Sequence, residues 1–408
     1  MKIVTFSTLF PNQVKPNHGI FVETRLRHLV ASGEVESRVV APVPWFPSAN
    51  ARFGQYATFA KVPRREERFG LQVEHPRYAV IPKIGMNLAP TLLAHGAKRT
   101  LARMIDEGYD FDLIDAHYFY PDGVAAVKLG RYFNKPVVIT ARGSDISLIP
   151  RHRVARKMIQ WAAHHADGII TVCNALKTEL VELGANAAKI TPLRNGVDLE
   201  RFRPGERPAL REQIGVSGFT LLAVGNLVPV KGHELAIGAL ALLPDVTLLL
   251  AGDGAERGRL EALARATGVA DRVRFLGVVP QAELPRYYSA ADALVLTSSR
   301  EGWANVLLES MACGTPVVAS RVWGTPEVVA APEAGRLMEE RSAQGVASTV
   351  NALRANYPDR AATRRYAEEF SWDNTTAGQV RLFKSIIKRR EAAATGGMSA
   401  VQTQPKSQ

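Results

Sequence analysis

The carboxylates with the clearest chemical context in this chain are Glu301 and Glu309, which are separated by seven residues. Glu301 follows an apolar run at residues 293–296, and Glu309 lies in a helix-like segment that ends at Gly314. This order predicts a strand-to-helix turn, and the free N–H groups at the start of a helix attract anions. A nucleotide-sugar needs amides for its diphosphate, one carboxylate for its ribose hydroxyls and one for its sugar. We therefore predict that this turn binds such a ligand.

Three further candidates lie at the ends of other expected strands. His117 closes the run 113–117, and an imidazole there can donate to a sugar hydroxyl or a phosphate. Arg142 follows the run 137–140, and its guanidinium could grip a phosphate through two hydrogen bonds. Lys231 precedes an expected helix, whose dipole would repel a lysine unless an anion is bound there. Ligands of parallel sheets lie beyond the carboxyl ends of the strands, so these residues share one predicted edge.

Several of these features also have an ordinary structural interpretation. Gly19, before the first expected helix, either lets a phosphate or sugar approach the backbone or belongs to a flexible loop. Asp145 either caps a helix or contacts a hydroxyl, and the turn at Asn195 and Gly196 could merely direct the chain. A lone histidine is more often structural, but His117 shares its predicted edge with the other candidates, which favours a functional role.

Two motifs resemble metal-binding or catalytic motifs but are interpreted as structural. Asp110 and Asp112 have Asp-x-Asp spacing, but they precede their strand and so lie at its other end. No metal site is therefore predicted. Cys313 is interpreted as a small buried hydrophobe, because no nearby histidine supports a nucleophilic pair.

Strand-like and helix-like segments alternate almost throughout the chain, which is typical of parallel α/β sheets. The expected strands are residues 3–6, 38–43, 113–117, 137–140 and 168–172, and then 220–224, 246–251, 273–276, 293–297 and 317–320. The expected helices of the first half are residues 21–31, 87–107, 124–133, 151–165 and 175–183. The predicted fold class is α/β, with two Rossmann-like doubly wound domains facing a cleft.

A polar segment at residues 199–207, with Pro204 and Gly205, has the composition of an interdomain linker. We therefore predict a first domain at 1–200 and a second at 201–370. Residues 52–68 are expected to form an exposed excursion. The tail, residues 391–408, is mostly small or polar and is predicted to be disordered.

The bulk composition limits the possible classes of protein. The chain has 408 residues, enough for two or three domains at roughly 150 residues each. Its two cysteines, Cys173 and Cys313, give no disulfide framework and fit a reducing compartment. The N-terminus resembles a first strand rather than a signal peptide, and no window approaches the ~20 apolar residues of a membrane span. We therefore expect a cytoplasmic protein.

The chain carries a net charge of +12, which suits nucleic acid, anionic lipid or phosphorylated substrates. Nucleic acid is not expected as a partner, because neither zinc-finger spacing nor an RNA-recognition signature is present. Basic residues gather in two helix-like segments. They are Lys83, Lys98, Arg99 and Arg103 in the first, and Arg151, Arg153, Arg156 and Lys157 in the second. Basic amphipathic helices favour anionic membranes, whereas the alternative is a solvated helix face.

The segment from Glu301 to Glu309, EGWANVLLE, resembles the Glu-(seven residues)-Glu motif of glycosyltransferase family 4. The neighbouring signatures stand in the order of that family. They are the Gly19 loop, His117, the Gly-Ser-Asp segment at 143–145, Asn-Gly-Val-Asp at 195–198, and residues 225–232 with Lys231. The resemblance covers roughly residues 1–390 and points to the exopolysaccharide and teichuronic-type subgroup.

This resemblance implies a GT-B fold with the acceptor in the N-terminal domain and the donor in the C-terminal domain. A final helix at about 371–390 would cross back to the first domain. It also implies transfer of a sugar from a UDP- or GDP-linked donor, with retention of configuration and with neither metal nor other cofactor. The expected acceptor is a lipid-linked or polysaccharide glycan, at the inner face of the cell membrane.

The resemblance further assigns roles to individual residues. Lys231 would bind the donor diphosphate, Glu309 the ribose and Glu301 the donor sugar, while Gly19 would let the N-terminal loop close on the diphosphate. His117 would contact the donor sugar at the reacting centre. Supporting backbone amides would come from Gly302, Trp303, Ala304 and Asn305.

Two donor-site positions depart from the family pattern. Asn226 stands where the family often has arginine, and Arg142 stands where it often has histidine. We expect these changes to affect rate and donor choice more than reaction class. The alternatives are a sugar-nucleotide epimerase, which would need no acceptor, and a non-catalytic scaffold that binds sugar nucleotides. A nucleic-acid-binding protein is a third alternative, and its binding would depend steeply on salt.

Overall fold

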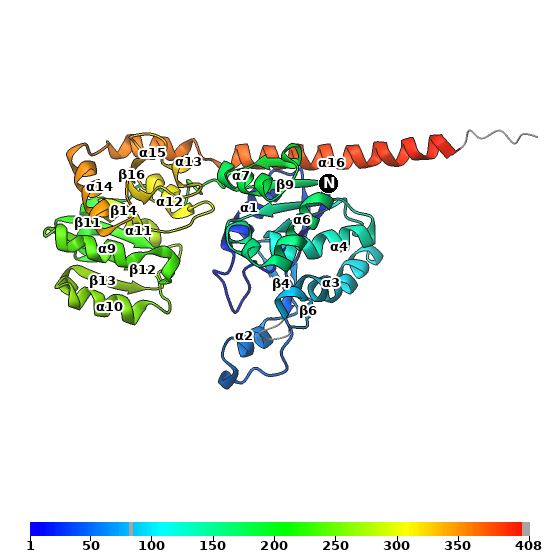
Figure 1. Cartoon of the computed structure of the whole chain (residues 1–408), viewed down its shortest axis with the longest axis horizontal. Coiled ribbons are helices and arrows are strands. Elements are labelled where there is room, and N and C mark those ends of the chain that lie inside the picture. Colours follow the sequence, from blue (N-terminus) through cyan, green and yellow to red (C-terminus); the bar gives the residue numbers. More distant parts are fainter. Residues whose placement is uncertain (81–84, 402–408) are drawn as a thin grey trace, which may run out of the picture. The chain divides into compact units, whose positions relative to one another are not determined.

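The computed structural model of this chain describes residues 1–80 and 85–401 (Figure 1). It divides into two compact units. The N-terminal unit contains Met1–Leu193 and the chain from Asp373 onward, and the C-terminal unit is Arg194–Trp372. The structure thus places the division after Leu193 rather than at residue 200, so the polar segment at 199–207 belongs to the C-terminal unit.

The N-terminal unit is built on one large sheet, with strand order β10-β9-β8-β7-β1-β2-β5-β4 within the described residues. Its strands are β1 Lys2–Phe6, β2 Glu36–Val40, β4 Arg65–Arg68, β5 Leu71–Glu74, β7 Leu113–His117, β8 Val137–Ala141, β9 Gly168–Thr171 and β10 Ile190–Pro192. Two short strands, β3 Val43–Pro44 and β6 Arg77–Tyr78, pair separately. Every residue of β7 and β8 is buried, as expected where helices cover both faces of a parallel sheet.

Helices connect the parallel strands of this unit. They are α1 Ile20–Ala31, α2 Gln55–Lys61, α3 Ala89–Asp106, α4 Val124–Phe133, α5 Ser144–Ser147, α6 Arg153–His165, α7 Asn174–Glu182 and α16 Trp372–Val401. Helix α16 packs its Phe383 and Ile386 into the same core as Ile3 and Val138. This packing explains why the chain returns to the N-terminal unit at its end.

Two expectations for irregular segments were wrong. The supposed excursion at 52–68 contains helix α2 and strand β4, which pairs antiparallel with β5. The strand was missed because its sequence, REER, is wholly charged, as edge strands often are. Residues 391–401 belong to α16 rather than to a disordered tail, since the alanines that follow Glu391 in the sequence favour helix. Residues 402–408, like Lys83 of the first basic segment, lie outside the described residues.

The C-terminal unit is a parallel sheet with strand order β13-β12-β11-β14-β15-β16 in the part that the structure describes. Its strands are β11 Phe219–Val224, β12 Val246–Ala251, β13 Val273–Gly277, β14 Ala293–Leu296, β15 Val317–Ser320 and β16 Gly335–Met338. Its helices are α8 Arg207–Ile214, α9 His233–Ala239, α10 Arg257–Ala266, α11 Leu284–Ala290, α12 Asn305–Ala312, α13 Thr325–Val328, α14 Ala343–Ala355 and α15 Arg360–Glu368.

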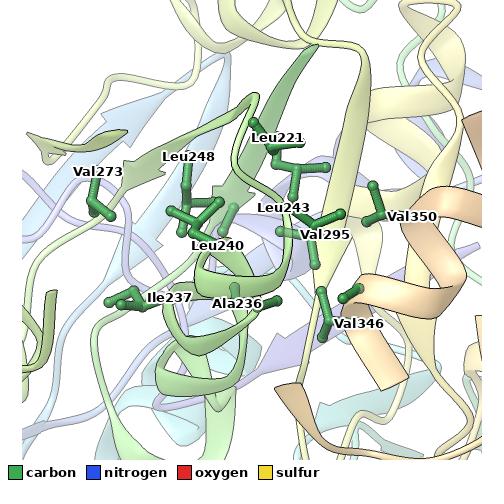
Figure 2. Packing of buried hydrophobic residues seen from close by; sticks show 14 of the residues in the cluster. Leu221, Ala236, Ile237, Leu240, Leu243, Leu248, Val273, Val295, Val346 and Val350 are labelled. Atoms are coloured by element: carbon green, nitrogen blue, oxygen red, sulfur yellow. The ribbon is translucent and has the colours of Figure 1, made fainter. Parts of the chain in front are cut away.

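The strand order reverses between β11 and β14, and ligands of such sheets bind at the point of reversal. Leu221, Leu248 and Val295 project from the sheet toward Ile237 of α9 and Val346 of α14, and all are buried (Figure 2). Each such side chain contributes roughly 1.5–3 kcal/mol of hydrophobic stabilisation. Thus a rigid core supports the loops that follow β11 and β14. Within residues 1–80 and 85–401, no helix has the length and apolarity of a membrane span.

Candidate functional site

In the N-terminal unit, His117 and Arg142 meet at the carboxyl ends of two adjacent strands. His117 is the last residue of β7, and Arg142 directly follows β8. The Arg142 Nη2 donates to His117 Nδ1 at 2.6 Å, and the guanidinium lies 5.2 Å from the ring centre of Phe21 on α1. The sequence-based expectation that these two residues share one edge of the sheet is therefore confirmed.

The imidazole of His117 is only 1% exposed, and its Nε2 lies 3.2 Å from Asp115 Oδ2. Burial lowers the pKa of His117, Asp115 opposes this shift, and the charge of Arg142 adds to it. Burial likewise lowers the pKa of Arg142 to about 9. Both ring nitrogens of His117 thus have protein neighbours. A direct contact between His117 and a donor sugar would require the loss of one of these two contacts.

Asp145 has a role that neither interpretation of its sequence anticipated. Its fully buried carboxylate accepts from the backbone N–H groups of Phe119 and Gly143, both at 2.7 Å, and of Arg142 at 3.1 Å. It therefore ties the loop after β7 to the loop after β8. Gly143 is the N-cap of α5, so Asp145 is not an N-cap, whereas its contact with a ligand hydroxyl stays a prediction.

The loop before α1 is fixed from two sides. Gly19 has φ +71°, and a Cβ there would lie 2.3 Å from the Leu9 carbonyl oxygen. The glycine is thus required by the chain's own backbone. At the start of the same loop, Thr8 donates through its hydroxyl to Asp122 at 2.9 Å and also through its N–H. Asp122 is fully buried, and burial raises its pKa to about 7.

In the C-terminal unit, Lys231 and Glu301 form an ion pair at the point where the strand order reverses. The Lys231 Nζ lies 2.6 Å from Glu301 Oε1, which also accepts from Ser298 Oγ at 2.6 Å. Lys231 belongs to the turn between β11 and α9, as predicted. Thr297, just after β14, donates to the Lys231 carbonyl at 3.0 Å and so joins the two loops.

Glu309 lies on α12 beside polar side chains that the sequence did not indicate. Its Oε2 accepts from the Tyr288 hydroxyl at 2.8 Å, and Gln281 and Arg201 are further neighbours. Arg201 in turn donates to Gln281 Oε1 at 2.7 Å. Burial nevertheless raises the pKa of Glu309 to about 7. These three neighbours come from distant parts of the chain, and no local motif marks them.

The segment between the two glutamates combines a turn with packed side chains. Helix α12 begins at Asn305, so the segment from Gly302 to Ala304 forms the turn that leads into it. The Trp303 ring is 7% exposed and stacks near Phe370, with ring centres 6.2 Å apart. Its side chain therefore supports the turn rather than a ligand.

Two other predicted positions are placed as follows. Asn226 is exposed in the loop after β11, and its carbonyl oxygen lies 3.3 Å from His233 Nε2. Asn305 accepts through Oδ1 from Asn195 Nδ2 at 3.2 Å, so the Asn-Gly turn supports α12.

Comparison with known proteins identifies the family. The description "Glycosyl transferases group 1" matches residues 207–370, and "Glycosyltransferase Family 4" matches residues 22–201. A D-inositol 3-phosphate glycosyltransferase of Corynebacterium urealyticum is 31% identical over 73% of this chain and 77% of the relative. The chain belongs to the family 4 glycosyltransferases. TuaC of Bacillus subtilis, whose name assigns it to teichuronic acid biosynthesis, is 29% identical over 86% of this chain and 88% of the relative.

Solved structures show the fold of this glycosyltransferase. Sucrose-phosphate synthase from Thermosynechococcus elongatus has a TM-score of 0.73, with 21% identity, and covers 98% of this chain and 99% of its own. Anabaena HepE in complex with UDP has a TM-score of 0.72, with 22% identity, and covers 94% of this chain and 100% of its own. The predicted GT-B fold, with two Rossmann-like units, is therefore confirmed.

The motifs interpreted as structural in this glycosyltransferase have protein partners. Asp110 pairs with Lys135 at 2.6 Å, and Asp112 accepts from the backbone N–H of Lys2 at 2.8 Å. Cys313 is buried, and burial raises the pKa of its thiol to about 12. Among the described residues, no group of three or more His, Cys, Asp or Glu side chains is arranged to hold a metal ion.

Proposed function

We propose that this glycosyltransferase transfers a hexosyl unit from a nucleotide-sugar to a lipid-linked or polysaccharide acceptor in cell-surface glycan synthesis. We further propose that transfer retains the anomeric configuration and needs neither a metal nor another cofactor. The observation that carries the proposal is the Lys231–Glu301 pair at the reversal of strand order. The name of TuaC supports a glycan acceptor, and the UDP-glucose bound to HepE makes UDP the first donor base to test, ahead of GDP.

Lys231 would stabilise the leaving diphosphate. It is the sole lysine of the sequence between residues 194 and 372, which otherwise uses arginine for positive charge. In the structure its ammonium pairs with Glu301. A bound diphosphate would compete for the ammonium and leave Glu301 to accept hydrogen bonds from sugar hydroxyls. Negative charge that builds on the leaving phosphate would then meet a fixed cation, which is a large term in such reactions.

The remaining donor contacts follow from the same unit. Glu309 would accept from the ribose hydroxyls, and the backbone N–H groups of the turn from Gly302 to Asn305 would support sugar and phosphate. Asn226 would take the place of the arginine that is common in the family. Since Asn226 carries no charge, Lys231 would bear more of the charge stabilisation.

The N-terminal unit would bind the acceptor and contribute Arg142, which contacts His117, to the binding of anionic oxygens. The guanidinium of Arg142 contacts His117 at the carboxyl ends of the N-terminal strands. It would bind an anionic oxygen, either on the donor diphosphate or on a charged acceptor. The glycine loop at Gly19 would close on the diphosphate, although its glycine is already required by Leu9.

A basic surface of the N-terminal unit would associate with anionic lipid. Arg151, Arg153 and Lys157 are exposed at the start of α6, where the helix dipole disfavours cations, and no acidic residue lies in the first turn. Within the described residues none of the three forms an ion pair. Leu148 and Val154 nearby are 39% and 44% exposed, respectively. Cations beside exposed apolar side chains suit the headgroup region of a membrane at its inner face.

The donor site is tested first by thermal unfolding with UDP, GDP, ADP and their sugar conjugates, without divalent metal. A ligand that binds only the folded state raises the apparent stability, so one nucleotide class should raise the Tm. Labelling of the Lys231 amine in the C-terminal unit should also slow when that nucleotide is bound. Absence of both effects for every nucleotide would refute the proposed donor site.

The lipid surface is tested by sedimentation with vesicles that contain anionic lipid, at low salt. Arg153→Glu with Lys157→Glu should abolish binding, whereas the matched pair Arg265→Glu with Arg365→Glu, on the C-terminal unit, should not. Turnover of a lipid-linked acceptor without any vesicle binding would contradict this part of the proposal.

A further inference from the structure

A line of buried polar side chains extends from His117 into the N-terminal unit. Asp115 and His117 are two residues apart on β7, so they project from the same face of the sheet. Asp115 Oδ2 accepts from Gln379 Nε2 at 3.0 Å, and Gln379 Oε1 accepts from Arg25 Nε at 2.8 Å. Arg25, Asp115, His117 and Gln379 are each 1% exposed. They come from α1, β7 and α16, so only the folded unit brings them together.

The contact between Arg142 and His117 determines where the imidazole proton lies. A guanidinium can only donate, so the 2.6 Å contact makes His117 Nδ1 the acceptor. In the neutral ring the proton must then be on Nε2, the nitrogen that faces Asp115. A doubly protonated ring would place a proton on Nδ1 against the guanidinium. Burial and the charge of Arg142 lower the pKa of His117 and so favour the neutral ring.

Hydrogen-bond donors converge on Asp115 from both sides. Arg25 donates to Gln379, which therefore must turn its amide N–H toward Asp115. Arg25 is itself held by the Leu193 carbonyl oxygen at 3.1 Å. From the other side, His117 Nε2 faces the same carboxylate oxygen. A buried carboxylate needs such donors and opposite charges. The positive charges of Arg25 and Arg142 both interact with the carboxylate of Asp115.

We propose that Asp115 and Gln379 are positioning residues for the transfer reaction, because they fix His117 as the Nε2–H tautomer and thereby hold Arg142. The consequence for catalysis rests on the proposed function, in which Arg142 binds an anionic oxygen. His117 acts through Arg142, as a fixed acceptor, rather than as a donor to the sugar. Helix α16 supports the site through Gln379, in addition to its hydrophobic packing.

The tautomer can be measured without any substrate. The full-length protein with ¹⁵N-labelled histidine gives two-bond ¹⁵N–¹H spectra that distinguish the two neutral tautomers from the protonated ring. The His117 signal is assigned by its loss in His117→Gln. We expect a neutral Nε2–H ring that resists protonation well below the ordinary histidine pKa of about 6.5. An Nδ1–H ring, or a His117 that titrates at its ordinary pKa, would overturn the proposal.

Two substitutions should move the titration of His117 in opposite directions. Arg142→Met removes a cation, so the pKa of His117 should rise, whereas Asp115→Asn removes the anion, so the pKa should fall. In Asp115→Asn, Gln379 and His117 both direct N–H groups at a side chain that offers a single acceptor oxygen. We therefore expect mixed tautomers in that variant. A merely structural role for Asp115 would leave the Nε2–H tautomer unchanged in Asp115→Asn.

Gln379→Leu tests the contribution of α16 and remains informative if Asp115→Asn fails to fold. It should lower kcat about tenfold or more, while changing the KM of the donor much less, because misplaced groups lose rate more than binding. Ser37→Ala, which removes a buried hydrogen bond to Thr5 at 2.9 Å outside this line, is the matched control and should leave kcat and the His117 spectrum unchanged. An unchanged tautomer and kcat in Gln379→Leu would refute its role. If instead no nucleotide binds, the proposed function fails while the tautomer result stands.

Discussion

Replacing Glu309 by glutamine should stabilise the C-terminal unit and weaken donor binding at the same time. Burial raises the pKa of this carboxyl from 4.5 to about 7. For a group whose pKa is raised on folding, the stability that it contributes is complete below the unfolded pKa and is lost as the pH rises through the folded pKa. At 1.36 kcal/mol per pKa unit, the loss above pH 7 is roughly 3 kcal/mol.

Glu309→Gln removes the buried charge but keeps an acceptor for the Tyr288 hydroxyl. The variant should therefore recover up to roughly 3 kcal/mol at about pH 8, and nothing near pH 4, where the native carboxyl is also neutral. For a unit of this size, each kcal/mol corresponds to about 2–4 °C in Tm. Donor binding should weaken about tenfold to hundredfold, because an amide presents N–H groups where the carboxylate would accept from ribose hydroxyls.

The assay is thermal unfolding of the full chain at both pH values, with and without UDP, followed by calorimetric titration of the nucleotide. Glu339→Gln, at an exposed glutamate of the same unit, is the control and should change neither quantity. The reasoning is refuted if Glu309→Gln lowers the Tm at the higher pH, or if it shifts the Tm equally at both pH values. Unchanged UDP affinity would separately refute the ribose contact.

Three other substitutions test the site and its supports. Lys231→Ala should lower turnover at least hundredfold, which corresponds to about 3 kcal/mol of barrier, whereas Lys231→Arg should retain part of the turnover. A loss below about tenfold for Lys231→Ala in steady-state kinetics would exclude the diphosphate role. Gly19→Ala should lower the Tm more than Gly33→Ala. Both glycines have a φ near +70°, but of the two only Gly19 would place a Cβ against the chain's own backbone. Equal shifts in Tm would contradict this reasoning. Phe383→Ala should cost roughly 3–5 kcal/mol in denaturant unfolding of the N-terminal unit, and Phe69→Ala, at a ring 64% exposed, should cost far less.

The sequence alone determined the alternation of strands and helices and the positions of the main candidate residues. Near-continuous apolar runs such as those of β12 and β15 matched their strands, because strands buried on both faces are rich in apolar residues. Lys231 and Glu301 could be placed near strand ends for the same reason, since each lies in the loop that follows such a run. The glutamate motif, together with the Lys231 loop and the neighbouring signatures, also indicated the family.

Only the tertiary structure decided how those residues are supported and charged. Three contacts join segments that are well separated in the chain. They are Tyr288 with Glu309, Gln379 with Asp115, and Asp145 with the backbone N–H of Phe119. The same contacts and the burial around them set the pKa of Glu309 and the tautomer of His117. Local patterns report which face of an element is apolar, but hydrogen bonding and desolvation depend on neighbours that only the packed chain supplies.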